Sequence, residues 1–451
     1  CIENFRLAAG EVQGFRTGWF FADSDAYKWL EAAARVWALT RDADLQKLMD
    51  EFISLLGRAQ QPDGYLFTYN QLHFPGVRWR NLQIEHELYC HGHLVEAGVS
   101  HFLATGREDM LQVARRAADR VVADFSGRGP EYTPGHEEIE IALLRLHGIS
   151  PGDGSYLAMA RQFIEQRGRI PHFARHIYLQ NKDTQERRKA VRTMRQEYTN
   201  THPGSKIYQL PPGNRAKHSR LTPLQWMLSA LRGEYNQQHA PLEQQVLPVG
   251  HSVRFAYLET AVAMHARLSG NQEHLPVLEK AWDHMLQHRM YLTGGIGSQP
   301  GLEGFGRDDA LDPEYAYAET CAALGSLFWN WEMAQLTGEA RYSDLFEWQL
   351  YNAALVGLGQ DGCTYLYNNP LASRGGITRR AWYSVPCCPS NLSRTLADLG
   401  KYMYSSDPGV LTVHQYISSE WDGSELSAGQ AACPGLQVRM TSELPWQGRV
   451  T

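Results

Sequence analysis

The sequence predicts a mainly α protein, an (α/α)6 barrel followed by the beginning of a β-sandwich domain. The main observation is a repeated pattern: an amphipathic helical segment ends in a short polar or glycine turn, and a second helical segment begins within a few residues. The turns of this pattern lie near Thr40, Gly106, Ser150, Gly270 and Gly338. The long interval between the third and fourth turns is expected to contain one more hairpin. Six such hairpins close into a ring.

The first helical segment illustrates the periodicity. Leu30, Ala33, Ala34 and Trp37 are spaced i, i+3, i+4 and i+7, so they form one apolar face that packs against the rest of the barrel. The connections between hairpins are long and contain many glycines, prolines and aromatic residues. They comprise residues 60–81, 126–136 and 293–315. Long loops in a compact domain usually carry function, and we expect these to converge at one mouth of the barrel.

The domain boundaries follow from composition. We assign residues 1–405 to the barrel and residues 406–451 to the start of a β-sandwich domain, because apolar and polar residues alternate after Tyr404 in segments such as GVLTVHQY and GLQVRM. Within the barrel, residues 167–220 are rich in Lys and Arg. A charged run of this kind is typical of a solvated, partly helical insertion, and a basic lid or partner surface is the alternative.

Composition also limits the kind of partner. The net charge of -6 gives no overall field that would attract nucleic acid, so a neutral, polar small molecule is the expected ligand. The sequence contains no apolar run of the about 20 residues that a membrane helix needs and no signal-peptide pattern, which favours a cytoplasmic protein. The 12 Trp and 22 Tyr are consistent with stacking on sugar faces or with core packing. The sequence leaves a homodimer open.

Cysteine usage indicates thiol chemistry and not a disulfide framework. The seven cysteines are odd in number and unevenly spaced, so reduced thiols, some of them bound to metal, are expected. Two cysteines are adjacent in VPCCPSN, residues 385–391, where Pro389 is suited to the first position of a helix. Both thiols would then lie at a helix N-terminus, where the dipole lowers a thiol pKa.

A second segment, YAETCAAL, carries Glu319 and Cys321 at the start of another helix. An i, i+2 pair faces one side if the chain is still extended there. Together with Cys387 and Cys388 these residues make a set of three thiolates and one carboxylate that suits tetrahedral zinc. Taken alone, Glu319 could be a helix N-terminal acid and Cys321 a small buried hydrophobic residue.

The order of several motifs resembles glycoside hydrolase family 127, the β-L-arabinofuranosidases. TGGIGS (293–298), GLEGF (301–305), YAETC (317–321) and CCPSN (387–391) carry the resemblance most specifically. DSDAYKWLEAA (23–33), HELYCHGH (86–93), GHEEIEIAL (135–143) and VGHSVRFAYL (249–258) extend it over most of the chain. The resemblance implies an (α/α)6 barrel followed by β-sandwich domains, a Zn²⁺ cofactor and a retaining exo-glycosidase. Its substrate would be a small carbohydrate that ends in β-L-arabinofuranose, released from plant-derived glycans or oligosaccharides.

The resemblance also implies roles for individual residues. Cys387 corresponds to the nucleophile and Glu303 to the general acid/base. Zinc would be held by Glu319, Cys321, Cys387 and Cys388. The substrate pocket would contain His86, His136, His251, Glu347 and Tyr367. His93 is a further candidate, because it follows His86 by seven residues and so lies on the same helix face. A zinc-bound thiolate stays ionised at neutral pH, which makes this unusual nucleophile chemically reasonable.

Two alternatives belong to other functional classes. Sugar epimerases and unsaturated uronide hydrolases also use helical barrels, but they would not need the Glu319, Cys321, Cys387 and Cys388 set. A non-catalytic carbohydrate-binding protein could use zinc only to pin two loops, but that hypothesis gives Glu303 no role.

Overall fold

The computed structural model describes residues 1–204, 222–407, 409–422, 436–444 and 446–451. In this part of the chain, six helices form a closed ring in which each contacts the next and the last contacts the first. The ring helices are α2 (Asp23–Thr40), α5 (Glu87–Thr105), α7 (Ile139–Ile149), α11 (Ser252–Ser269), α13 (Thr320–Thr337) and α15 (Cys387–Leu396).

An outer helix follows each of the first five ring helices. These outer helices are α3 (Ala43–Ala59), α6 (Asp109–Phe125), α8 (Ser155–Glu165), α12 (Leu275–His284) and α14 (Ala340–Gln349). The five predicted turns connect these pairs, and Gly106, Gly270 and Gly338 end their ring helices in the left-handed conformation that glycine adopts without strain. The prediction of an (α/α)6 barrel is therefore confirmed.

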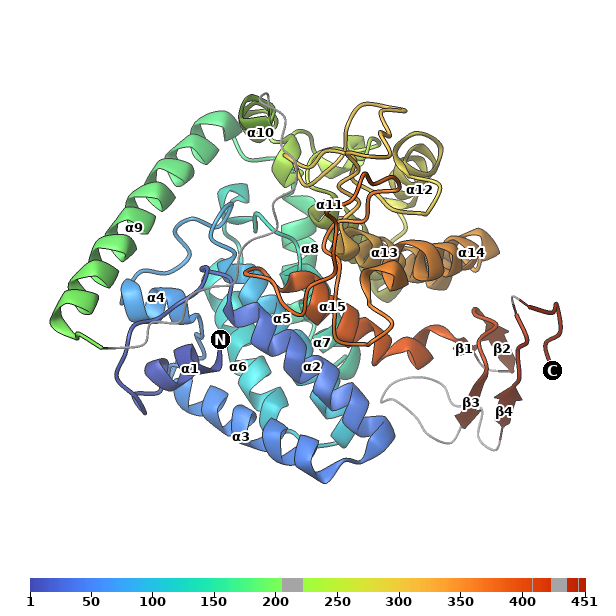
Figure 1. Ribbon diagram of the computed structural model, residues 1–451, viewed down its shortest axis with the longest axis horizontal. Coiled ribbons are helices and arrows are strands. Elements are labelled where there is room, and N and C mark those ends of the chain that lie inside the picture. The colour runs from blue at the N-terminus through green and yellow to red at the C-terminus, as the bar shows by residue number, and fades with distance from the viewer. Residues whose placement is uncertain (205–221, 408, 423–435, 445) are drawn as a thin grey trace.

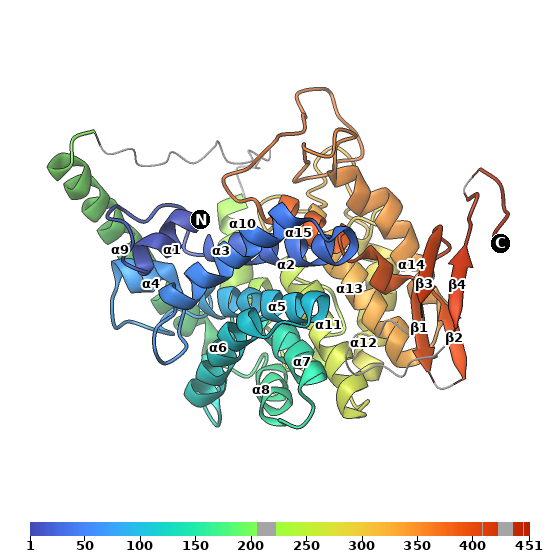
Figure 2. The same ribbon diagram turned by 90° about the horizontal axis from the view of Figure 1, so that it is seen from below.

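The position predicted for the sixth hairpin is wrong. The interval between Ser150 and Gly270 holds α9 (Phe173–Thr201) and α10 (Thr222–Leu231), which contact each other, while the sixth ring helix is α15. The long α9 is mostly polar and exposed, and it lies at one end of the molecule (Figures 1 and 2). It supplies most of the predicted basic insertion, and residues 205–220 of that insertion lie outside the described residues.

The ring helices differ from ordinary surface helices because they are buried on nearly all sides. In α13, for example, every residue from Thr320 to Leu327 is buried. Several of these buried side chains are charged, including Glu31 on α2 and Arg394 on α15. The centre of the barrel is therefore a polar core enclosed by apolar helix contacts.

Strands begin directly after the last helical turn. β1 (Tyr404–Asp407) pairs antiparallel with β2 (Val410–Val413), with Tyr404 opposite Val413. β3 (Ser419–Asp422) pairs antiparallel with β4 (Gln437–Met440), with Ser419 opposite Met440. Both pairs lie at the end of the molecule opposite α9 (Figure 2). A complete β-sandwich stays a prediction.

The remaining elements are short. They are α1 (Ile2–Ala8), α4 (Thr68–His73), η1 (Pro130–Tyr132), η2 (Glu234–Asn236), η3 (Leu242–Gln244), η4 (Met285–Arg289), η5 (Leu350–Ala354), η6 (Leu355–Gly357) and η7 (Leu399–Tyr402). Among the helices that the structure describes, none is both long enough and apolar enough to cross a membrane.

Candidate functional site

Three thiols and one carboxylate meet where the N-termini of two neighbouring ring helices approach each other. Glu319 immediately precedes α13 and Cys321 lies in its first turn, whereas Cys387 and Cys388 begin α15. The four potential ligand atoms all lie within 4.8 Å of one another. The Sγ atoms of Cys321 and Cys388 are 3.3 Å apart, and Glu319 Oε1 is 3.6 Å from the Sγ atoms of both Cys387 and Cys388.

Local backbone geometry explains this convergence. Glu319 is still extended, with φ -62° and ψ 137°, and Thr320 starts the helix while its N–H donates to the carbonyl of Tyr367 (3.0 Å). Glu319 and Cys321 can therefore face the same side, as the sequence predicted. The helix of the cysteine pair begins at Cys387, two residues before the predicted start at Pro389. Pro389 fits within the first turn because an N–H there has no partner inside the helix.

The donor set fits a thiophilic divalent metal ion. Glu319, Cys321 and Cys388 are buried, and Oε2 of Glu319 has no hydrogen-bond partner among the described residues. A buried carboxylate oxygen without a partner is costly, so a cation at this position would satisfy it. Three sulfur donors and one oxygen donor provide four ligands, the number and kind that tetrahedral zinc sites use.

Cys387 differs from Cys388 in facing a cavity. The cavity has a volume of about 260 Å³ and is lined by Cys387, Cys321 and Glu319 but not by Cys388. Hydrogen bonds from the thiols of Cys321 and Cys388 lower the pKa of Cys387 well below the usual thiol range, and the ammonium of Lys28 acts in the same direction. The hydroxyl of Tyr367 lies 3.2 Å from Cys387 Sγ: it accepts from the thiol, and its own O–H can donate to the thiolate, which also lowers the pKa of Cys387. Cys387 is therefore the thiol most readily ionised and the one open to a ligand.

Glu303 reaches the same cavity from the glycine-rich loop before α13. Its backbone has a φ of 50°, in the left-handed region, and its carbonyl accepts hydrogen bonds from both the N–H and the hydroxyl of Ser252 (3.0 Å each). These two bonds hold the strained conformation. The side chain remains 45% exposed, which gives its carboxylate access to a ligand.

His251 orients Glu303 through a defined tautomer. The N–H of Val253 donates to His251 Nδ1 (3.2 Å), so Nδ1 carries no proton. In the neutral ring the proton is then on Nε2, which lies 3.2 Å from Glu303 Oε2 and donates to it. Burial lowers the pKa of His251, although the nearby Glu303 opposes this shift, so the neutral form is favoured.

His86 and His136 have the opposite tautomer. His86 Nδ1 lies 2.7 Å from the carbonyl of Ile84, and His136 Nδ1 lies 3.0 Å from the carbonyl of Glu137. Because a carbonyl only accepts, both Nδ1 atoms carry the proton and both Nε2 atoms are acceptors. Burial lowers the pKa of His86 to about 3 and that of His136 well below its ordinary value, so both rings stay neutral.

The structure brings most of the predicted pocket residues together. Beside Cys387 and Glu303, the cavity wall includes His86, His136, His251 and Tyr367. Two candidates lie elsewhere. Glu347 is on the outer helix α14, whose buried face packs against the ring, so it is not among the residues that line the cavity. His93 is fully buried in the barrel and its Nδ1 lies 2.9 Å from Glu138 Oε1. Both are corrections to the sequence prediction.

Sequence reasoning missed several residues of the cavity wall. They include Trp19, Asp25, Lys28, Tyr89, Arg188, Tyr235 and Arg254. Four of them lie inside motifs that already carried the family resemblance: Asp25 and Lys28 in DSDAYKWLEAA, Tyr89 in HELYCHGH and Arg254 in VGHSVRFAYL. The motifs were recognised in the sequence, but these residues within them were not predicted to line the site. Arg188 comes from α9 and stacks its guanidinium on Trp19 (5.0 Å to the ring centroid), a contact between segments that no local pattern indicates.

The fold and the site thus define the chain as an (α/α)6-toroid protein with a thiol and carboxylate cluster beside a cavity of about 260 Å³. More particularly, the chain belongs to the β-L-arabinofuranosidase family GH127, whose catalytic-domain model matches residues 1–401. The resemblance seen in the sequence is therefore confirmed.

Individual relatives agree with this assignment. The chain is 33% identical to a non-reducing end β-L-arabinofuranosidase of Bifidobacterium longum subsp. longum, over 100% of this chain and 64% of the relative. It is also similar to the crystal structure of a GH127 β-L-arabinofuranosidase from Geobacillus stearothermophilus T6, with TM-score 0.82, 35% identity, and coverage of 100% of this chain and 65% of the other. A GH127 β-arabinofuranosidase structure gives TM-score 0.78 and 30% identity, with coverage of 100% and 62%. The chain thus spans a little under two thirds of the length of these relatives.

Proposed function

We propose that this chain is the catalytic part of a zinc-dependent retaining exo-glycosidase that releases non-reducing-end β-L-arabinofuranose from plant-derived glycans or oligosaccharides. The observation that carries the proposal is that Cys387, a member of the metal-binding cluster, and Glu303, held by His251, line one cavity of about 260 Å³. Ligand pockets begin at about 300 Å³, so this cavity suits a single sugar ring. The activities of the named relatives support the choice of sugar.

Zinc is the proposed occupant of the Glu319, Cys321, Cys387 and Cys388 cluster. Bound zinc would keep the cysteines ionised at neutral pH and hold the nucleophile in place. Cys388 and Cys321 are more deeply buried than Cys387, so they would act as permanent ligands, while Cys387 is the thiolate that a substrate can reach.

The proposed reaction has two displacements at the anomeric carbon. In the first, Cys387 Sγ forms a bond to this carbon while the bond to the leaving oxygen breaks, and Glu303 gives its proton to that oxygen. In the second, the ionised Glu303 takes a proton from water, the water oxygen bonds to the anomeric carbon, and the carbon–sulfur bond breaks. Each displacement inverts the carbon, so the configuration is retained overall.

Two of the three histidines suit the recognition of sugar hydroxyls, and the third orients Glu303. His86 and His136 offer neutral Nε2 acceptors, so they suit hydroxyl groups that donate. The Nε2–H of His251 is directed to Glu303, which keeps the carboxylate oriented toward the cavity. Hydrogen bonds of this kind favour a neutral polyol over a charged ligand, in agreement with a neutral pentose.

A panel of aryl furanosides and pyranosides tests the proposal. We expect turnover of the aryl β-L-arabinofuranoside and its loss in Cys387→Ser, because a hydroxyl is a much weaker nucleophile than a thiolate. NMR of the reaction should show the β anomer of L-arabinose first, before the free sugar equilibrates with its other forms in solution. Turnover of none of the panel, or equal turnover by wild type and Cys387→Ser, would contradict the proposal. Epimerisation of free sugars or cleavage of unsaturated uronides would instead support another toroid enzyme, and sugar binding without turnover would support a binding protein.

A further inference from the structure

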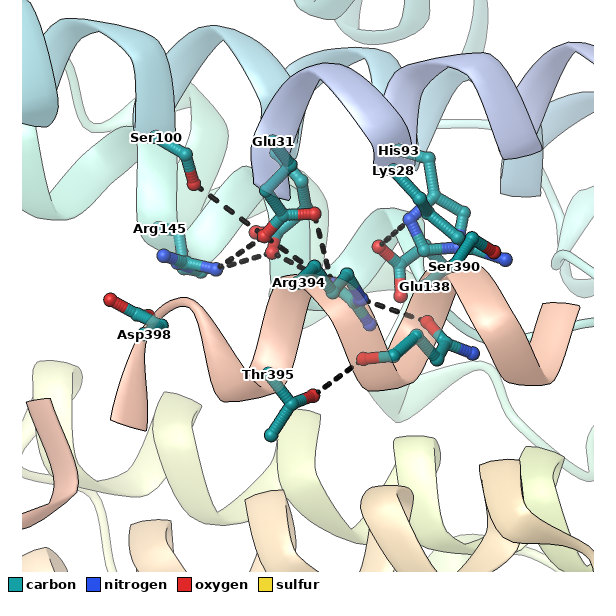
Figure 3. Close-up of polar contacts among 12 residues, drawn as sticks. Lys28, Glu31, His93, Ser100, Glu138, Arg145, Ser390, Arg394, Thr395 and Asp398 are labelled. Atoms are coloured by element: carbon teal, nitrogen blue, oxygen red, sulfur yellow. Dashed lines mark hydrogen bonds and ion pairs between the residues drawn. The ribbon is translucent and has the colours of Figure 1, made fainter. Parts of the chain in front are cut away.

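A buried polar network lies along α15, beyond the cysteine pair that begins this helix. Arg394 of α15 is its centre (Figure 3). The guanidinium Nη1 donates to Glu31 Oε2 on α2 (3.2 Å), and Nη2 donates to the hydroxyl of Tyr257 on α11 (3.0 Å). Arg394 is 4% exposed and Glu31 is 0% exposed. The side chain is thus held by two other ring helices.

The charges of this network are strongly fixed. Burial alone would raise the pKa of Glu31, but the charges of Arg35, Arg394 and Arg145 outweigh it and lower the pKa to about 2. Glu31 therefore stays ionised and keeps its arginine partners in place.

One donor of Arg394 points toward the cysteine cluster. Its Nε–H donates to the side-chain oxygen Oδ1 of Asn391 (2.8 Å). An arginine Nε can only donate, so the atom of the amide that faces it is the oxygen. This settles the orientation of the Asn391 amide: its NH₂ group is turned to the other side, where Nδ2 lies 3.2 Å from Cys321 Sγ. Asn391 is 1% exposed, so water does not compete for this bond.

The bond matters because of the charge in the cluster. Three thiolates and a carboxylate bring four negative charges, of which a divalent cation neutralises two. An N–H directed at one sulfur disperses part of the excess and makes that sulfur a poorer nucleophile. Cys321 receives such an N–H from a fixed amide, whereas the group 3.2 Å from Cys387 Sγ is the hydroxyl of Tyr367, which can rotate and can donate or accept. The two thiols that line the cavity are thereby made unequal.

We propose that Asn391 and Arg394 are positioning residues: Arg394 fixes the Asn391 amide so that its N–H bonds to Cys321 Sγ, which keeps Cys321 a metal ligand and leaves Cys387 as the nucleophile. This inference rests on the proposed function for the role of Cys387. Asn391 lines the cavity whereas Arg394 does not, and neither is one of the four cluster residues.

The test compares Asn391→Ala and Asn391→Asp with wild type after loading with Co²⁺, which reports on thiolate ligands by its sulfur-to-metal charge-transfer band. Both variants lose the N–H donor, and the aspartate keeps the bond to Arg394 and the side-chain volume. Loss of the hydrogen bond raises the energy of the sulfur electrons, so the band should move to longer wavelength. Metal affinity, measured by competition with a chelator, should fall by about 10–100-fold, and kcat should fall by a similar factor with little change in KM.

Arg145→Lys is the matched control. Arg145 contacts Glu31 and Glu96 in the same buried network but does not contact Asn391. The Arg145→Lys variant should have a lower melting temperature than wild type, whereas its charge-transfer band and its metal affinity, measured by competition with a chelator, should be unchanged. Arg394→Lys should instead shift the band, because a lysine that pairs with Glu31 no longer fixes the Asn391 amide.

Two outcomes overturn the inference. An unchanged band together with unchanged metal affinity in folded Asn391→Ala and Asn391→Asp would show that the N–H does not act on the cluster. Failure of the wild type to bind Co²⁺ would overturn both this inference and the proposed metal site. If Co²⁺ binds and the band shifts but no β-L-arabinofuranoside is hydrolysed, only the proposed function fails.

Discussion

A single methyl group added at Gly304 should disable the site without unfolding the barrel. A Cβ at this position would lie 1.8 Å from the carbonyl oxygen of Gly250, and real Cβ contacts are not shorter than 3.0 Å. The two backbone segments must therefore separate by at least about 1.2 Å, since no flexible side chain can give way. The separation breaks the hydrogen bond from Phe305 N–H to Gly250 O (2.9 Å) and moves the adjacent Glu303 away from His251. A misplacement of about 1 Å can cost about 100-fold in rate.

The assay is kcat/KM of Gly304→Ala on an aryl β-L-arabinofuranoside, alongside thermal unfolding. Gly295→Ala in the same loop is the control, because its Cβ would meet Ala318 Cβ at 3.2 Å and Thr293 Oγ1 at 3.5 Å, contacts that need only a small adjustment. We expect a loss of about 100-fold for Gly304→Ala and less than about threefold for the control. Wild-type kcat/KM in Gly304→Ala would show that the close approach to Gly250 does not position Glu303, and the reasoning would fail.

Three further outcomes are expected. With an aryl substrate that has a good leaving group, Glu303→Gln should accumulate a thioglycoside on Cys387, because no base then activates water. Intact-protein mass spectrometry would show this adduct as one added pentosyl mass. Absence of the adduct would count against the proposed roles of Cys387 and Glu303. Metal analysis should find about one zinc per chain, and Cys388→Ser should lose most of it, whereas full activity in the metal-free protein would exclude the proposed cofactor role. The folded pKa of Glu31, about 2, is below its ordinary value, so its stabilisation is complete above about pH 4.5 and is lost as the pH falls through about 2. The melting temperature of Glu31→Gln should therefore fall less steeply than that of wild type over this acid range, and parallel curves would refute the coupling.

The hairpin periodicity predicted the barrel because outer helices have one apolar face. The five turns from Thr40 to Gly338 were found through exposed polar residues and C-terminal glycines, signals that belong to solvent-facing hairpins. The sixth ring helix escaped this reasoning. α15 has no outer partner after it among the described residues, and its buried face includes Asn391, Arg394 and Thr395, which resemble a surface helix in sequence.

The cysteine cluster could be predicted because its chemistry is local. Each half of it lies within three residues, and soft donors at helix starts have few other uses. Glu347 shows the opposite case: the family resemblance implied a place in the pocket, but its helix lies in the outer layer. Arg188 was missed because the contact of α9 with Trp19 depends on how the insertion folds back over the cavity, which no period or motif specifies.

The last ring helix ties the site to the fold. α15 contacts both α13 and α2, so it closes the barrel, and its first two residues are half of the cysteine cluster. Three residues after this pair Asn391 reaches back to Cys321, and three residues further Arg394 binds Glu31 on α2. The single short helix α15 therefore bonds to the first ring helix, α2, and to the fifth, α13, and also carries the proposed nucleophile. Any change that loosens the docking of α15 is transmitted to Cys387 directly, because the residue that begins the helix is also the residue proposed to attack the sugar.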